Sequence, residues 1–364
     1  MRLLELTRAY FPSVGGLEKS ISDKVRIYKA LGIDFKIVST DFYSKLNDSP
    51  RDPDVIYLKQ YTPYNITPAI RRHLEKNYDI INVNMIGRFF SDFAILNYAS
   101  TKTKIVLTPH SFYHTRNYYI IKIFLEMWLF PALLKKIDAM VVFTHHEKKE
   151  WVKRYHIDER RIFVIPHFID STFGSAQEYR NDPDVKEYIV YVGRRENNKQ
   201  TDLLLRTFSS LKDIQYSLYL TLTDSDIAGD VREAVKKDKR IKLLGFVSDE
   251  EKNNLLRNAA GAIFPTSFES FGYTAFEASC HSKPLLCSDI PVFRELLSGN
   301  GVLYFENTQN SLGDALIKFG KLSPDEKHNM GGTNKRHLSN YTFDESVKKY
   351  ATLFQFLSQK GENS

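Results

Sequence analysis

Cysteine is scarce in this chain of 364 residues, which contains only Cys280 and Cys287. The two stand seven positions apart and form neither a CxxC pair nor a Cys-His pair, so they indicate neither a disulfide framework nor a zinc site. Residues 1–16 also lack the long apolar core of a secretory signal and are typical of a first strand that enters a glycine loop. We therefore expect a cytoplasmic protein.

An uninterrupted apolar run of membrane-spanning length is also missing. The most apolar stretch, residues 118–134, is broken by two charges and a proline, and Lys135 and Lys136 follow it at once. We interpret it as a helix of the hydrophobic core. A helix that lies on the inner face of a membrane is the alternative, since lysines beside an apolar face favour that location.

Basic residues are not concentrated in one arm, although 51 Lys and Arg against 44 Asp and Glu give a net charge of +7. The excess favours anionic partners such as phosphate groups. Its scatter does not indicate a nucleic-acid footprint, so we expect no nucleic-acid partner.

The motifs of several other enzyme classes are missing. There is no G-x-S-x-G elbow, no P-loop and no H-E-x-x-H frame. Three Asp-x-Asp triplets, which begin at Asp52, Asp182 and Asp224, could hold a divalent ion. The first two lie in proline-bearing turns; the third follows a predicted strand and is the better metal candidate, but we interpret it as a plain loop.

Short apolar runs alternate with helical stretches in two successive series, and this rhythm predicts parallel sheets. The chain is also longer than the roughly 250 residues of most single cores. We therefore expect an α/β protein with two doubly wound domains, joined near residues 166–170, and a terminal helix at residues 343–357. The predicted strands are residues 3–6, 35–38, 80–83, 105–107, 139–143, 188–192, 217–222, 241–244, 262–264 and 284–287.

The most informative segment, residues 264–277, runs from a strand end through a loop into a helix. Glu269 is expected in the loop at the carboxyl end of the strand, where open α/β sheets bind ligands, and Glu277 just over one turn inside the helix. Gly272 permits close approach of a ligand to the main chain, and the helix start near Tyr273 suits a diphosphate. An exposed loop acid and a solvated helix acid are the alternative.

A second strand-to-helix loop carries positive charge, with Arg194 and Lys199 after Gly193. An arginine fork and a lysine point charge together can neutralise a departing diphosphate without a metal. A solvated basic loop is the alternative interpretation.

These loops resemble those of the family 4 glycosyltransferases, also called glycosyl transferases group 1, which have the GT-B fold and retain anomeric configuration. Residues 15–18 are similar to the family's glycine loop, Gly193-Arg194 with Lys199 to its diphosphate clamp, and Glu269 through Glu277 to its E-x7-E signature. Residues 245–247 resemble its nucleotide-base loop, and residues 164–170 its interdomain stretch.

The resemblance implies two Rossmann-like domains that face each other across a cleft. Residues 1–168 would form the acceptor-side domain, with the helix at 343–360 packed back on it, and residues 169–342 the nucleotide-sugar-binding domain. Glu269 and His110 would be catalytic. The implied donor-binding residues are Gly16, Arg194, Lys199, Gly245, Phe246, Val247, Phe271, Gly272, Tyr273, Thr274 and Glu277.

Several positions depart from the family pattern: Gln200 and Ser282 stand where glycine is common, Ser270 where glycine often precedes Phe-Gly, and His167 where asparagine is usual. None of these changes removes a charge that the reaction needs. The resemblance therefore implies transfer of a sugar from a UDP- or GDP-sugar to a hydroxyl of a glycan, a lipid-linked glycan or a small molecule, without a metal or other cofactor. A catalytically inactive nucleotide-sugar-binding protein is the alternative.

Overall fold

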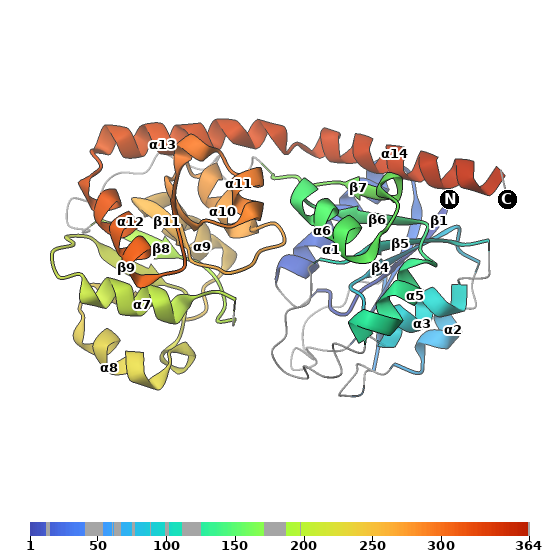
Figure 1. Cartoon of the computed structure of the whole chain (residues 1–364), viewed down its shortest axis with the longest axis horizontal. Helices are drawn as coiled ribbons and strands as arrows, with labels where there is room; N and C mark the ends of the chain where they lie inside the picture. Colours follow the sequence, from blue (N-terminus) through green and yellow to red (C-terminus); the bar gives the residue numbers. More distant parts are fainter. Residues whose placement is uncertain are drawn as a thin grey trace. The chain divides into compact units, whose positions relative to one another are not determined.

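The structure is a computed structural model that describes residues 1–11, 15–40, 54–59, 61, 67–74, 77–87, 89–98, 102–110, 125–170, 187–196 and 198–362. The chain divides into two compact units. The first comprises Met1–Phe168 and Phe343–Ser364, and the second comprises Ile169–Thr342. Each unit has its own parallel sheet (Figure 1).

The sheet of the first unit has the strand order β3-β2-β1-β4-β5-β6-β7. Its order reverses between β1 and β4, which are neighbours in space, as in a doubly wound fold. The strands are β1 (Arg2–Leu6), β2 (Asp34–Thr40), β3 (Val55–Leu58), β4 (Ile80–Asn84), β5 (Lys104–Thr108), β6 (Ala139–Val142) and β7 (Ile162–Val164).

Helices cover both faces of this sheet. Successive strand residues point to opposite faces, so the apolar strands need packing partners on each side. Leu3 packs in a cluster with Ile27 of α1 and Leu353 of α14. Leu4 packs on the other face with residues of α3 and α5. The helical elements are α1 (Gly16–Ala30), α2 (Ile70–Leu74), α3 (Phe89–Tyr98), the π-helical turn η2 (Leu125–Leu129), α5 (Phe130–Leu134), α6 (His145–Tyr155), the 3-10 turn η3 (Glu159–Arg161) and α14 (Phe343–Glu362).

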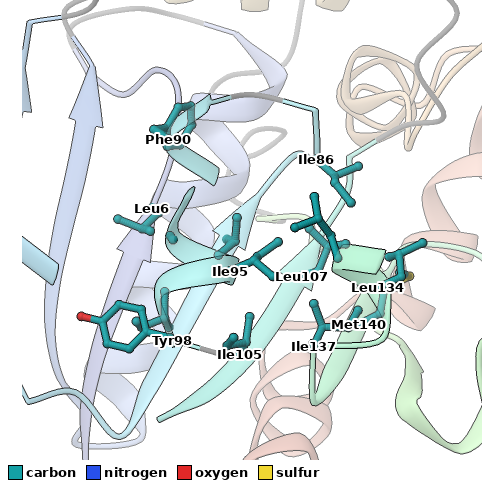
Figure 2. Packing of buried hydrophobic residues seen from close by; sticks show 14 of the residues in the cluster. Leu6, Ile86, Phe90, Ile95, Tyr98, Ile105, Leu107, Leu134, Ile137 and Met140 are labelled. Atoms are coloured by element: carbon teal, nitrogen blue, oxygen red, sulfur yellow. The ribbon is translucent and has the colours of Figure 1, made fainter. Parts of the chain in front are cut away.

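Figure 2 shows the packing on the face covered by α3 and α5. Leu107 of β5 and Met140 of β6 lie against Ile95 of α3 and Leu134 of α5, and all four side chains are at most 3% exposed. This dense core fixes the ends of β4 and β5, from which site residues of the first unit emerge.

The sheet of the second unit has the order β10-β9-β8-β11-β12-β13. Here the order reverses between β8 and β11. The strands are β8 (Tyr188–Tyr191), β9 (Ser217–Leu220), β10 (Ile241–Leu243), β11 (Gly261–Phe264), β12 (Leu285–Ser288) and β13 (Val302–Phe305).

Two groups of helices accompany this sheet. Helix α7 packs against α8 and α12, while α10 packs against α9 and α13 (Figure 1). The starts of α9 and α13 have the Ser-x-x-Glu capping box that stabilises a first turn, with Ser248 and Ser323 as caps. The helical elements are α7 (Thr201–Ser210), η5 (Asp224–Asp226), α8 (Gly229–Lys237), α9 (Asp249–Asn258), α10 (Tyr273–Cys280), α11 (Pro291–Leu296), η6 (Gly299–Gly301), α12 (Gln309–Lys321), α13 (Pro324–His337) and η7 (Leu338–Asn340).

All ten predicted strands occur, with ends shifted by one or two residues, and the terminal helix begins at Phe343 as predicted. Three strands were not predicted: β3, β7 and β13. Each of them is an edge strand of three or four residues.

The end of α10 contains a backbone conformation that favours glycine. Ser282 has φ +54°, and the turn is closed by a hydrogen bond of 3.2 Å from Lys283 N to Ala278 O. A non-glycine residue in this left-handed region costs roughly 1–2 kcal/mol. We therefore expect Ser282→Gly to raise the free energy of unfolding by about 1 kcal/mol and the melting temperature by about 2–4 °C.

The matched control is Ser282→Ala, which removes the same hydroxyl but keeps the Cβ, and it should give no rise. Thermal unfolding followed by circular dichroism compares the two variants. Equal melting temperatures for them would show that the backbone at this position is not strained.

Candidate active site

The loops that follow β8 and β11 begin at the carboxyl ends of two neighbouring strands, where the order of the second sheet reverses. Crevices that bind ligands form at this point in doubly wound sheets. The basic loop, residues 192–200, and the acidic loop, residues 265–272, therefore lie side by side although about 70 residues separate them in the sequence.

Hydrogen bonds join the two loops. The main-chain N of Ser267 donates to the carbonyl oxygen of Asn198 at 2.8 Å, and the Asn198 side-chain amide donates to the carbonyl oxygen of Phe268 at 2.9 Å. The hydroxyl of Thr266, itself buried, also donates to Asn198 O at 3.1 Å. Basic and acidic loops thus form one rigid unit before any ligand binds.

Lys199 and Glu269 form an ion pair within this unit, with the Lys199 ammonium donating to Glu269 Oε1. The two side chains are 24% and 15% exposed, so water screens their attraction less than that of a surface pair. The structure thus brings together Lys199, predicted to bind the diphosphate, and Glu269, predicted to be catalytic. An anionic ligand that reaches Lys199 would compete with Glu269 for it.

Arg194 lies in the same basic loop as Lys199 and is exposed. Two hydrogen bonds anchor the backbone of this loop. Gly193 N donates to the Thr221 hydroxyl at 3.0 Å, and the Tyr191 hydroxyl donates to Arg194 O at 3.2 Å. A Cβ at Gly193 would lie 2.7 Å from the Tyr191 oxygen, so the loop needs a glycine here. The guanidinium thus extends from an anchored backbone.

Helix α10 begins at Tyr273, as predicted, and Gly272 precedes it with φ +87°. A Cβ at Gly272 would lie 2.7 Å from Phe293, so both the conformation and the space require glycine. The first main-chain N–H groups of α10 and the positive end of its dipole lie at Tyr273 and Thr274, an arrangement that can bind phosphates. The Phe271 ring is buried and stacks on Phe276 at 4.5 Å, which fixes the preceding loop.

Glu277 lies one turn further into α10 and is buried. Lys252 of α9 donates to Glu277 Oε1 at 3.2 Å and also pairs with Asp249 at 3.1 Å. Burial lowers the pKa of Lys252, but these two carboxylates outweigh it and raise the pKa above its ordinary value. Lys252 therefore stays charged and holds one oxygen of Glu277 in place, a role that the sequence analysis missed.

Residues 245–247 form a turn after β10. Gly245 has φ +71°, and its N donates to Leu222 O at 3.0 Å. Phe246 is 90% exposed, the most exposed of the large apolar side chains in the described part of the chain. Val247 follows and is half-buried. An exposed ring on an anchored turn is suited to stacking against a flat aromatic ligand.

Two predicted residues belong to the first unit. Gly16 is the first residue of α1, after the loop that leaves β1, and His110 follows β5. His110 has φ +59° and forms a hydrogen bond of 2.7 Å from Nε2 to Asn84 Oδ1. Burial, and then the charge of Lys24, lower the pKa of His110 well below its usual value, so the ring is neutral.

The sequence analysis missed a group of buried polar residues beneath His110. Glu5, Asn82 and Asn84 are at most 3% exposed, although they stand within apolar strands. Polar residues at such positions in the runs LLEL and IINVN were the available indication, because buried polar groups need partners.

The triplet at Asp224 is engaged in local structure. Asp226 accepts hydrogen bonds from Thr223 N at 2.8 Å and from its hydroxyl at 2.7 Å, and Asp224 pairs with Arg232 at 3.4 Å. Asp52 and residues 182–184 lie outside the described residues, and Asp54 pairs with Lys36 at 2.9 Å. Over the part of the chain that the structure describes, no three His, Cys, Asp or Glu side chains are grouped to hold a metal ion.

Fold and site together define a two-domain GT-B protein whose second Rossmann-like unit carries the Lys199–Glu269 ion pair at the point where its sheet order reverses. Family models identify it further. The model described as Glycosyl transferases group 1 matches residues 176–337, and the model described as Glycosyltransferase Family 4 matches residues 14–173. The chain belongs to glycosyltransferase family 4, and it is a glycosyltransferase.

Individual relatives agree with this family. The GDP-mannose:cellobiosyl-diphosphopolyprenol alpha-mannosyltransferase of Komagataeibacter xylinus is 23% identical over 375 residues, which cover 98% of this chain and 93% of the relative. The sucrose-phosphate synthase of Thermosynechococcus elongatus has a similar fold, with a TM-score of 0.77 at 16% identity over 99% of each chain. Anabaena Alr3699/HepE, solved in complex with UDP and glucose, has a TM-score of 0.75 at 12% identity over 98% of this chain and 99% of that one. The chain thus acts in glycosyl transfer for glycan synthesis.

No helix among the described residues combines the length and the apolar character needed to cross a membrane.

Proposed function

We propose that this protein transfers a sugar from a nucleotide diphosphate sugar to an acceptor hydroxyl with retention of anomeric configuration. The observation that carries the proposal is the rigid unit in which Lys199 and Glu269 are paired at the switch point of the second sheet, next to the start of α10. It offers a cation for the leaving diphosphate and a carboxylate for the sugar within one hydrogen bond of each other.

In this mechanism the bond between the anomeric carbon and the diphosphate breaks, and a bond from the acceptor oxygen forms on the same face. The acceptor proton passes to the departing diphosphate. Arg194, Lys199 and the N-terminus of α10 stabilise the negative charge that grows on the diphosphate. Glu269, with the main chain at Phe271 and Gly272, orients the sugar and stabilises positive charge at its anomeric carbon.

The nucleotide is bound by the outer part of the same unit. Glu277, with one oxygen held by Lys252, accepts hydrogen bonds from the ribose hydroxyls, and Phe246 stacks on the base beside Gly245 and Val247. A role of Gly16 and His110, both in the first unit, in binding the sugar stays a prediction from the family resemblance.

The relatives support a choice between two donors. The Komagataeibacter enzyme is named for GDP-mannose, whereas UDP and glucose are bound in the Anabaena structure. The same name supports retention, because the mannose of GDP-mannose is α-linked and that enzyme is an alpha-mannosyltransferase. We propose a GDP-sugar or a UDP-sugar as donor.

We further propose that the reaction needs no metal ion, because Arg194, Lys199 and the N-terminus of α10 would supply the positive charge that neutralises the diphosphate. Donor consumption should then be unchanged after exhaustive treatment with EDTA. A loss that added magnesium or manganese restores would contradict this part of the proposal.

Ligand-induced stabilisation is the direct test of donor binding. Thermal unfolding is measured with UDP, GDP and ADP and their common sugars, and the true donor at 100 times its dissociation constant should add about 2.7 kcal/mol of stability. Phe246→Ala is the matched control. This exposed side chain contributes little to folding, but its removal should weaken the binding of every nucleotide. A panel in which no nucleotide raises the melting temperature would contradict the proposed function.

A catalytically inactive nucleotide-sugar-binding protein is the second candidate, favoured only by the unusual Gln200, Ser270 and Ser282 in the donor-binding unit. It would give the same thermal shifts but neither hydrolysis nor transfer of a radiolabelled donor.

For the acceptor we propose a lipid-linked glycan, met at the inner membrane face of the cytoplasm. The relative named above acts on a diphosphopolyprenol acceptor. In this chain Met127 and Trp128 are 63% and 68% exposed, and Lys135 and Lys136 are exposed nearby in the same unit. Co-sedimentation with anionic vesicles tests this location. If Trp128→Ala no longer co-sediments, the Trp128 side chain is part of the membrane contact.

A further inference from the structure

A network of buried polar side chains lies between β1 and β4 of the first unit, where the order of that sheet reverses. Glu5 of β1, Lys24 of α1 and Asn84 of β4 are its centre, and each is at most 1% exposed. Burial of a charge is costly unless it is paired and hydrogen-bonded. A network at this place therefore needs an explanation beyond packing.

Every acceptor position of Glu5 is directed at a donor. The Lys24 ammonium donates to Oε1, and the Tyr28 hydroxyl donates to Oε2 at 2.8 Å. The side-chain amide of Asn82 donates to Oε2 at 2.9 Å, and that of Asn84 to Oε1 at 2.7 Å. The carboxylate of this β1 residue is thus held by donors from two other elements, α1 and β4.

The contacts of Asn84 determine which way its amide group faces. Its nitrogen donates to Glu5 Oε1 and to Leu6 O, both at 2.7 Å, and its oxygen accepts from Lys24 Nζ at 2.8 Å. A reversed amide would set its oxygen against two acceptors and its nitrogen against the lysine donor. Lys24, Glu5 and the Leu6 carbonyl oxygen together therefore fix Asn84 Oδ1 on the side of His110.

His110 Nε2 lies 2.7 Å from this same Asn84 oxygen, which can only accept. The proton of the neutral ring must then reside on Nε2, and the lone pair on Nδ1. We propose that Lys24 is a positioning residue that, through Asn84, holds His110 in its Nε2-protonated tautomer.

Three further observations agree with a tuned histidine. The His110 backbone has φ +59°, a conformation that is costly for a non-glycine residue and that clusters at functional sites. Its ring is also packed 5.5 Å from Phe143, which limits its rotation. Burial and the nearby charge of Lys24 lower its pKa, so the network keeps the ring neutral as well as oriented.

In this tautomer Nδ1 of His110 carries a lone pair and can only accept a hydrogen bond. A role of this acceptor in sugar transfer rests on the proposed function. The tautomer itself can be measured without any donor.

The experiment records ¹⁵N spectra of the histidine rings in the full chain, with His110 assigned by its absence from His110→Asn. In the wild-type protein at a pH where the ring is neutral, Nε2 should carry the proton. In Glu5→Gln/Lys24→Met, which removes both buried charges and so leaves neither unpaired, the ratio of Nε2-protonated to Nδ1-protonated ring should fall by about tenfold or more.

Tyr28→Phe is the matched control, because it removes a buried hydrogen bond of Glu5 without touching Asn84, and the ratio should stay within about twofold of wild type. A wild-type ring protonated on Nδ1 overturns the proposal whether or not the double variant folds. An unchanged ratio in the double variant, or an equal change in the control, also overturns it. Sugar transfer by His110→Asn is measured alongside, and full activity there would reject the role of His110 in the reaction while leaving the tautomer result intact.

Discussion

Replacing Lys199 with alanine should lower the turnover of the sugar donor by about 10² to 10³-fold, the usual effect of removing one preorganised donor from a charge-stabilising site. The ammonium is paired with Glu269 and the Lys199 side chain is 24% exposed, so water screens its charge only partly. Steady-state kinetics with the donor identified by thermal shift measure the effect.

The fold should survive this change. Loops joined through Asn198 and Ser267 do not depend on the lysine side chain, and Glu269 can be solvated when its partner is gone. Arg195→Ala is the matched control, since Arg195 lies in the same loop but pairs with Asp202 at 3.5 Å, and it should change turnover by less than about threefold. Unchanged turnover in Lys199→Ala would reject the assignment of the diphosphate clamp.

The central strands of both sheets could be predicted from the sequence because both of their faces are buried. Strands such as β1, β4, β8 and β11 are covered on each side and are therefore nearly continuous apolar runs. The edge strands β3 and β13 are buried only at their first and last residues, as in the run VIYL. A run of four half-buried residues has no clear period, which is why these edges were missed.

The site was predictable where chemistry is concentrated in a short stretch of sequence. The loop from Glu269 to Glu277 and the loop from Gly193 to Lys199 each contain charge, glycine and a helix start within ten residues. Their pairing was not predictable, because the Lys199–Glu269 contact depends on the adjacency of β8 and β11.

Long-range partners were missed for the same reason. Lys252 stands in a polar helix with nothing to mark it, and only the packing of α9 on α10 brings it to Glu277. Lys24 likewise occupies a position that a helical pattern assigns to the buried face, where a lysine would be excluded unless a carboxylate such as Glu5 faced it from another strand. Contacts between residues this far apart in the sequence are determined by the topology of the fold, which a local pattern does not contain.

Replacing Glu269 with glutamine should also lower turnover by about 10² to 10³-fold, but it should not weaken the binding of the donor. Glutamine keeps the shape of the side chain and removes its charge, so positive charge at the anomeric carbon loses its stabilising carboxylate. Lys199, released from its partner, becomes fully available to the diphosphate. The dissociation constant of the donor, measured by calorimetry, should therefore stay the same or fall while the rate of the chemical step drops.

The double variant Lys199→Ala/Glu269→Gln separates this account from one in which the two residues act independently. Independent effects would multiply, to a loss of about 10⁴ to 10⁶-fold. The two groups are in contact and stabilise opposite charges that develop in the same step. We therefore expect the rate of the double variant to be within about tenfold of the rate of the less active single variant. Single-turnover rates of the four proteins complete the cycle. A fully multiplicative loss would mean that the ion pair seen between these loops has no part in the reaction, and that the two residues contribute at separate steps.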